Sequence, residues 1–179
     1  MQRISVVGNS GSGKSTFAKQ LSALLNIPHI ELDSVFHQPN WTQLENEEFR
    51  ARVTTATNDE CWVTCGNYRH VIDIVWSRAD TIVVIDFPRR IVMWRITKRT
   101  ILRSLKREEL WNGNREPFLN FIALHNPEKS VIAWAWTRHR HYHNTYRAAA
   151  EVSDNGATWL FFTKPREVRQ FLDNCSGRA

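Results

Sequence analysis

The segment from Gly8 to Ser15, with the sequence GNSGSGKS, constrains the fold more than any other part of the chain. It fits the pattern G-x-x-x-x-G-K-[ST], in which backbone N–H groups surround a phosphate. The apolar run 4–7 predicts a buried strand before the segment, and the apolar spacing over 16–25 predicts a helix after it. A strand, a glycine-rich turn and a helix start in this order predict a polyphosphate site.

We call Gly8–Ser15 the P-loop, and its residue types indicate what each part would bind. A chance Gly/Ser-rich turn is disfavoured because the match spans eight positions between a strand and a helix. Lys14 is expected to reach the β and γ oxygens of ATP as a catalytic group, and the Ser15 hydroxyl to ligate Mg²⁺. The predicted ATP-binding residues of this segment are Gly8, Ser10, Gly11, Ser12, Gly13, Lys14, Ser15 and Thr16.

Length and composition fit one folded α/β domain. The chain has 179 residues, of which 42% are hydrophobic, and this suffices for a full core and a small insertion. No run approaches the roughly 20 apolar residues that cross a bilayer. The first residues lead directly into a predicted strand without a signal-peptide pattern, and the 3 cysteines lack metal or disulfide spacing. We therefore expect a cytoplasmic protein.

The chain is basic, with a net charge of +6 and a pI near 9.6, which predicts anionic partners such as nucleic acid, nucleotides or phosphorylated metabolites. Arg95, Arg99, Arg103 and Arg107 recur every fourth residue and would form one cationic face of a helix. Like charges at this spacing repel one another unless an anion meets them. We expect Arg95 and Arg99 to face ATP phosphates, and Arg103 and Arg107 to be solvated.

The pattern along the chain predicts alternating strands and helices. The predicted strands are 4–7, 29–32, 62–65, 81–85 and 158–162. The predicted helices are 16–25, a helix ending near 57 that starts at a capping box of Thr42 and Glu45, 71–76, 89–106, 128–150 and 165–173. Residues 34–42 and 108–117 are expected to be loops, the second a candidate lid. This alternation predicts a parallel sheet covered on both faces.

Ligands of such sheets bind at the carboxyl ends of the strands. The P-loop, Asp33, the segment 66–69, Asp86 and the segment 163–165 all follow predicted strands. Because parallel strands end at one edge of the sheet, we expect these residues to contribute to one site.

These segments also carry a resemblance to a known family. The P-loop, Leu32-Asp33, Gly66-Asn67-Tyr68-Arg69, Phe87-Pro88 with Arg95 and Arg99, and the segment around Arg138 and Arg140 recur in this order in the adenylate-kinase-like P-loop kinases. The chain most resembles the DNA topology modulation (FlaR-type) proteins, over nearly its whole length. The resemblance implies a P-loop NTPase fold of three α/β/α layers, with a five-stranded parallel sheet in the order 2-3-1-4-5. It also implies one domain, 1–179, with a small helical lid inserted at about 103–130.

The resemblance implies residue roles as well. It places ATP at the P-loop and the acceptor beyond strands 2 and 3, where Arg69 matches a residue that grips the acceptor's phosphate. Arg95 and Arg99 match catalytic arginines at the base of the lid, and Arg99 also contacts ATP. Arg138 and Arg140 match arginines that close on the transferring phosphoryl group, and we expect one of the two to point inward. Lys164 and Pro165 fall where adenine is usually packed.

The chain departs from the family at Cys65. Relatives carry Asp directly before Gly-Asn-Tyr, at a position that helps to hold the Mg²⁺ shell. Either Asp33 performs this role alone, or phosphoryl transfer is weakened.

Several candidates have a structural alternative. Asp33 could hold Mg²⁺ or accept the proton of an attacking hydroxyl, as a catalytic, metal and acceptor-site residue, or it could cap a turn. Trp41 and Tyr68 could stack on an acceptor ring or be buried, and Gly66 lies beside them at the expected acceptor site. Asp86 could line the site or cap the helix after Pro88.

These observations predict an ATP-dependent, Mg²⁺-assisted phosphotransferase that acts on a small molecule, most simply a nucleotide or nucleoside. The alternative is a nucleic-acid-associated ATPase or ATP-switched regulator linked to DNA topology, which the positive charge would suit. A third possibility, suggested by Cys65, is a nucleotide-binding protein without turnover. The sequence contains no helix-turn-helix, zinc knuckle or ribonucleoprotein motif.

Overall fold

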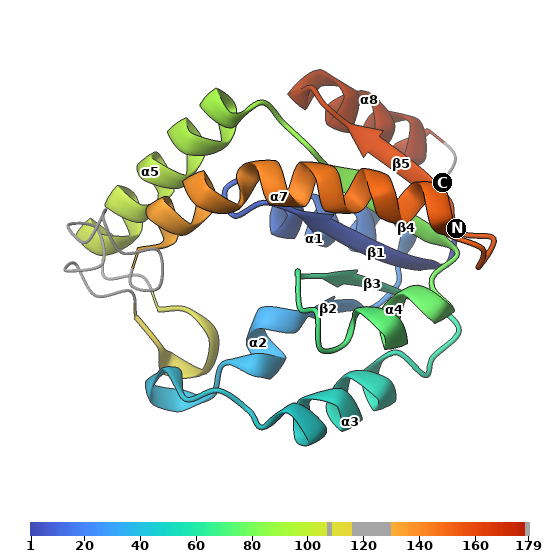
Figure 1. Cartoon of the computed structure of the whole chain (residues 1–179), viewed down its shortest axis with the longest axis horizontal. Helices are drawn as coiled ribbons and strands as arrows, with labels where there is room; N and C mark the ends of the chain where they lie inside the picture. The colour runs from blue at the N-terminus through green and yellow to red at the C-terminus, as the bar shows by residue number, and fades with distance from the viewer. Residues whose placement is uncertain (107–108, 116–129, 178–179) are drawn as a thin grey trace.

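A computed structural model describes residues 1–106, 109–115 and 130–177 of the chain (Figure 1). Five strands lie among its elements: β1 (Arg3–Gly8), β2 (His29–Glu31), β3 (Trp62–Cys65), β4 (Thr81–Ile85) and β5 (Thr158–Phe162). The helices are α1 (Lys14–Leu25), α2 (Leu32–Phe36), α3 (Asn46–Ala56), α4 (Ile72–Arg78), α5 (Arg89–Lys106), α7 (Val131–Val152) and α8 (Pro165–Ser176). Two 3₁₀ turns, η1 (Pro39–Trp41) and η2 (Trp111–Gly113), complete the described elements.

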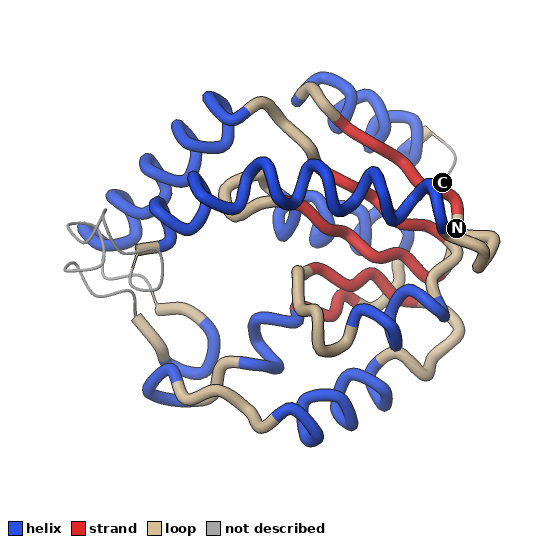
Figure 2. Tube along the Cα trace, in the orientation of Figure 1, coloured by secondary structure: helices blue, strands red, loops and turns tan. Residues whose placement is uncertain are grey.

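The five strands form one parallel sheet in the order β2-β3-β1-β4-β5, which confirms the predicted fold class and strand order. The central strand β1 pairs with β3 on one side, Ile4 opposite Val63, and with β4 on the other, Ile4 opposite Thr81. Helices lie on both faces of the sheet in Figure 2. Every residue of β3 and β4 is buried, as expected for strands covered on both faces.

The two faces of the sheet carry separate apolar cores because successive side chains of a strand point in opposite directions. On one face, Val83 and Ile85 pack with residues of α1 and α8, including the fully buried Phe17. On the other face, Ile82 and Val84 pack with residues of α3, α4 and α7. The P-loop lies where β1 leaves this double core, so its position is fixed by buried strands.

Two predictions for residues 32–45 are wrong. The segment predicted as a loop from residue 34 contains α2 and η1, and Asp33 lies in the first turn of α2, directly after β2. Leu32, Val35 and Phe36 share one face of this short helix and pack into the second core. The predicted capping box is also absent: α3 begins after Glu45, which makes no side-chain cap, and Thr42 lies outside the helix.

The expected lid is described only in part. Residues 107–108 and 116–129 lie outside the described residues, as does the expected start of the second long helix near 128, so the lid stays a prediction. The described segment 109–115 contacts η1 and α2, where Asn112 donates hydrogen bonds to the backbone oxygens of Ser34 and His37. Within the described parts of the chain, no helix is both long enough and apolar enough to cross a membrane.

Candidate active site

The P-loop is held from both sides of the sheet edge. The Asn67 amide clamps Gly8, donating to the Gly8 oxygen at 2.6 Å and accepting from the Gly8 N–H at 3.2 Å. Asn9 is buried and donates to the Ala135 oxygen of α7 at 2.7 Å. Its side-chain oxygen accepts from the Ser10 N–H at 2.8 Å. These bonds tie the loop to the β3–α4 turn and to a helix far along the chain.

The interior of the P-loop contains polar groups that fit a polyphosphate. Ser12 Oγ is buried, and no described residue provides it with a hydrogen-bond partner. Burial lowers the pKa of Lys14, against the opposing effect of the negative charge of Asp33. Among the described residues, no ion pair engages the Lys14 ammonium. A buried cation without a counterion is unfavourable, and a bound anion would relieve this.

Ser15 and Cys65 meet at the expected Mg²⁺ position. Cys65 Sγ lies 3.6 Å from Ser15 Oγ, and the side chain is buried. Burial raises the pKa of the Cys65 thiol to about 12, so the group is neutral near pH 7. The Ser15 hydroxyl and Asp33 carboxylate are oxygen ligands of the kind that Mg²⁺ prefers, and they fit this ion, whereas the neutral thiol adds no charge to hold it.

We expect Cys65→Asp to tighten Mg²⁺ binding. A carboxylate beside Ser15 adds a negative charge next to the ion, and we expect the half-saturating Mg²⁺ concentration for ATP turnover to fall by about tenfold, or ~1.4 kcal/mol. Cys65→Ser is the matched control, because it keeps a neutral side chain there. Equal Mg²⁺ titrations for Cys65→Asp and Cys65→Ser would show that this position does not act on the ion.

Asp33 is oriented by a tyrosine from the turn that follows the neighbouring strand β3. The Tyr68 hydroxyl donates to Asp33 Oδ1 at 2.6 Å, and His37 Nε2 lies 3.4 Å from the same hydroxyl. The Tyr68 ring packs against Phe36 and Phe49, with centroids 4.8 and 5.1 Å apart. Burial, with the Asp33 charge next, raises the pKa of Tyr68 well above its usual range, so its proton stays in this hydrogen bond.

The acceptor-side residues predicted beyond β2 and β3 do lie on neighbouring segments. Gly66 packs against Leu32, since a Cβ there would lie 2.8 Å from Leu32 Cβ. Trp41 is half-buried, its ring 5.4 Å from that of His37, and its indole N–H donates to the Arg115 oxygen. Arg69 is exposed. The structure brings Asp33 and Tyr68 into contact, while contacts of Trp41 and Arg69 with an acceptor stay predictions.

The arginines expected around ATP occupy two helices. Arg95 of α5 donates to the Ser12 oxygen at 3.0 Å and lies 4.9 Å from the centre of the Phe87 ring, so it reaches the P-loop. Arg99 is half-buried one turn later, and its charge contributes to lowering the pKa of Lys14. Arg138 and Arg140 of α7 are both exposed, Arg138 stacks on Trp134, and a contact of either arginine with the transferring phosphoryl group stays a prediction.

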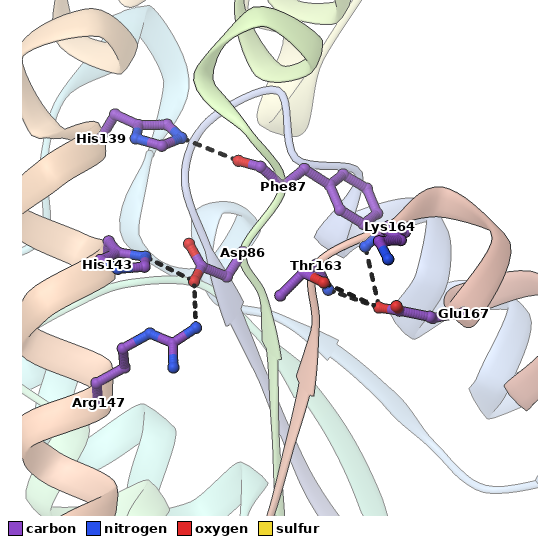
Figure 3. A network of polar contacts seen from close by, with 8 residues as sticks. All are labelled: Asp86, Phe87, His139, His143, Arg147, Thr163, Lys164 and Glu167. Atoms are coloured by element: carbon purple, nitrogen blue, oxygen red, sulfur yellow. Dashed lines mark hydrogen bonds and ion pairs between the residues drawn. The ribbon is translucent and has the colours of Figure 1, made fainter.

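The segment expected near adenine forms a regular helix start. The Glu167 carboxylate accepts from the N–H groups of Thr163 and Lys164 at 2.8 and 3.0 Å (Figure 3). The bond from the Lys164 N–H, followed by that from Thr163, holds the pKa of Glu167 below its usual value. These bonds fix the backbone around Lys164 and Pro165 at the end of β5. Adenine binding by these two residues stays a prediction.

Asp86 joins β4 to α7 instead of capping a helix. Asp86 Oδ2 lies 2.7 Å from His143 Nδ1 and 3.4 Å from Arg147 Nη2, as Figure 3 shows. His139, one turn earlier, lies with Nε2 2.9 Å from the Phe87 oxygen. The contacts of Asp86 therefore do not support the alternative that it caps the helix after Pro88. Asp86 anchors α7 behind the P-loop.

Sequence reasoning missed three residues that shape the site. Asn9 and Asn67 hold the P-loop, and His37 contacts the hydroxyl that orients Asp33. Asn9 is one of the variable positions of the P-loop pattern, so the pattern gave no reason to single it out. Asn67 and His37 each lie within a few residues of a predicted site residue, and this proximity is the signal in the sequence that could have identified them.

Fold and site together define the class of structure: a five-stranded parallel α/β fold with a P-loop, an acidic residue after β2, and Arg95 of α5 in contact with the loop. No protein-family model and no curated protein matches the chain.

Solved structures with the same fold are P-loop kinases. The chain is similar to a gluconokinase from Sinorhizobium meliloti 1021, with 16% identity, coverage of 99% of this chain and 92% of that chain, and a TM-score of 0.52. It is similar to shikimate kinase from Aquifex aeolicus, with 19% identity, 98% and 97% coverage, and a TM-score of 0.53. Shikimate kinase from Acinetobacter baumannii, in complex with shikimate, gives 19% identity, 97% and 90% coverage, and a TM-score of 0.53. The likeness confirms the P-loop kinase fold, and the closer resemblance to FlaR-type proteins stays a prediction.

Proposed function

We propose that the protein transfers a phosphoryl group from ATP, with Mg²⁺, to a small-molecule acceptor, and that the acceptor is a nucleotide or nucleoside. The observation that carries this proposal is the combination of a half-buried Lys14 in the P-loop, for which the described chain provides no ion-pair partner, with an oriented carboxylate, Asp33. A switch protein needs the first group, and an acid for Mg²⁺, to bind ATP, but it has no need of a carboxylate oxygen left open for an acceptor hydroxyl.

Different described residues would bind the phosphates, hold Mg²⁺ and stabilise charge during phosphoryl transfer. The P-loop backbone and Lys14 would hold the β and γ phosphates, while Ser15 and Asp33 would hold Mg²⁺, which neutralises charge on the phosphates when bound. Arg95 and Arg99 add positive charge on the α5 side, where charge spreads in the transition state. Catalysis of this kind depends on positioning and electrostatics, so no protein nucleophile is needed.

The acceptor side supports an alcohol or phosphate oxygen as the attacking group. Asp33 can accept a hydroxyl proton through the oxygen that Tyr68 leaves open. Trp41 would stack on a base, and Arg69 would bind an acceptor phosphate. These roles make nucleosides and nucleoside monophosphates the first acceptors to test.

The test is ATP consumption with Mg²⁺ against nucleosides, nucleoside monophosphates and hydroxylated metabolites. Shikimate and gluconate belong in the panel because structural neighbours are named for them. We expect one acceptor to raise turnover far above the acceptor-free rate, and Lys14→Ala to abolish the increase. Tight ATP binding with no acceptor-dependent turnover across the panel would refute the kinase proposal and leave an ATP switch.

One observation favours a second candidate, an ATP-dependent protein that binds nucleic acid. A surface groove of about 320 Å³ runs along α5, and the described residues that line it are positive or apolar and include no acid: Trp94, Arg95, Lys98, Arg99, Leu102, Arg103 and Lys106. Trp94 is 64% exposed and could stack on a base. DNA binding that weakens steeply with salt and persists without ATP would support this candidate. Salt-independent or absent binding would exclude it.

A further inference from the structure

We propose that Tyr68 is a positioning residue that fixes the Asp33 carboxylate for the acceptor, with His37 orienting the Tyr68 hydroxyl. This inference rests on the proposed phosphoryl transfer and identifies how the chain prepares its acceptor-side carboxylate. Tyr68 then acts through Asp33 instead of touching the reacting atoms.

The hydrogen bonds among His37, Tyr68 and Asp33 allow only one direction of donation. A tyrosine hydroxyl has one proton, and at 2.6 Å this proton is committed to Asp33 Oδ1. Bonds to a carboxylate are short and about twice as strong as neutral ones. His37 can then contact the Tyr68 oxygen only as a donor, through a proton on Nε2 at 3.4 Å. The chain of donation runs from His37 to Tyr68 to Asp33.

The packing around Tyr68 keeps this chain in place. The Tyr68 ring lies among Phe36 and Phe49, both parts of the second core, so its hydroxyl has little freedom to turn. The backbone of His37 is fixed in turn, because its oxygen accepts from the Asn112 side chain and its N–H donates to the backbone oxygen of Asp33. The carboxylate is therefore oriented by groups whose own rotamers are locked, as precise positioning requires.

Fixing Asp33 also keeps it apart from Lys14. The two charges interact strongly enough that Asp33 opposes the lowering of the Lys14 pKa, yet no ion pair between them occurs in the described chain. An unrestrained carboxylate would be free to turn toward the Lys14 ammonium and neutralise it. With Oδ1 held by Tyr68, Oδ2 remains for the acceptor hydroxyl and Lys14 remains for phosphate.

A double-mutant cycle tests the proposal with the acceptor that the panel identifies. We expect Tyr68→Phe to lower kcat for the acceptor roughly 10–100-fold, with the KM for ATP unchanged. In an Asp33→Ala background, the same change should alter kcat less than about twofold, because the hydroxyl has nothing left to orient. Equal effects in both backgrounds would overturn the proposal, since a structural role is independent of Asp33.

The matched control is Tyr146→Phe, which removes a hydroxyl from another buried tyrosine, far along the chain on α7. We expect it to leave kcat unchanged, and a loss equal to that of Tyr68→Phe would overturn the specific role.

A crystal structure of Tyr68→Phe separates this proposal from the proposed function. We expect the Asp33 carboxylate to turn from its wild-type orientation, whether or not any acceptor is phosphorylated. An unchanged Asp33 would overturn the positioning role. If wild-type protein phosphorylates nothing in the panel, the proposed function fails, while this comparison still decides whether Tyr68 holds Asp33.

Discussion

Lys14→Ala should reduce phosphoryl transfer roughly 10³-fold or more, which is the upper range for loss of one preorganised charge donor. Lys14 is half-buried in the P-loop, and the described chain provides it with no ion-pair partner. Its charge is therefore directed at whatever anion binds there. The measurement is kcat with saturating Mg²⁺-ATP and the identified acceptor, together with ATP affinity by calorimetry.

Lys19→Ala is the matched control, because Lys19 lies on the same helix but is exposed. We expect Lys19→Ala to behave as wild type. Comparable activity of Lys14→Ala and Lys19→Ala would contradict the role of the P-loop lysine.

The same lysine predicts a pH dependence. Burial lowers the Lys14 pKa below its usual 10.5, so the ammonium of the ATP-free protein is lost at a lower pH than in an exposed lysine. ATP binding should therefore weaken as the pH rises through this depressed pKa, and binding in that range should take up a proton. Calorimetry in buffers of different ionisation enthalpy measures the proton directly, and Lys14→Ala should take up none.

Gly11→Ala should destabilise the fold by about 2–5 kcal/mol. Gly11 has φ +83°, which strains an L side chain, and a Cβ would lie 2.7 Å from Ile96 Cβ and 2.9 Å from the Val92 oxygen of α5. The strain contributes roughly 1–2 kcal/mol and the overpacking roughly 1–3 kcal/mol. Urea and thermal unfolding measure the loss, which corresponds to a Tm roughly 4–20 °C lower at this chain length.

Gly156→Ala separates these two contributions. Gly156 has a similar φ of +71°, but nothing lies within 4 Å of an added Cβ. We expect this variant to lose only the strain contribution, about 1–2 kcal/mol. If both variants lose the same stability, the close approach of α5 to the P-loop does not contribute to the destabilisation by Gly11→Ala.

Most of the sheet could be predicted from the sequence because β1, β3, β4 and β5 are short and largely apolar runs, and buried parallel strands need no partner-specific signal. The order of the strands came from the resemblance, since alternation alone fixes crossovers but not positions. The pattern does not predict helix α2, because the turn signal of Pro39 and Asn40 favours a loop for the whole segment 34–42. The spacing of Leu32, Val35 and Phe36 was the signal that could have corrected this.

The candidate site could be predicted as a set of strand ends but not as a set of contacts. Asp33 and Tyr68 were both placed on the acceptor side, yet a hydrogen bond between residues 35 positions apart depends on how two turns pack. Asp86 pairs with His143, 57 positions later, and no local pattern links them. Cys65 was recognised as a departure, but its burial and neutral thiol required the structure.

The bond between Asn9 and Ala135 has a consequence for how the protein is made. The two residues are separated by 126 positions, so Asn9 leaves the ribosome well before Ala135. Such long-range contacts form late, after the loop between them has closed. The nascent P-loop therefore lacks its α7 anchor until most of the chain has been translated. The P-loop is therefore expected to gain its full affinity for phosphate only after α7 has been translated and packed against it.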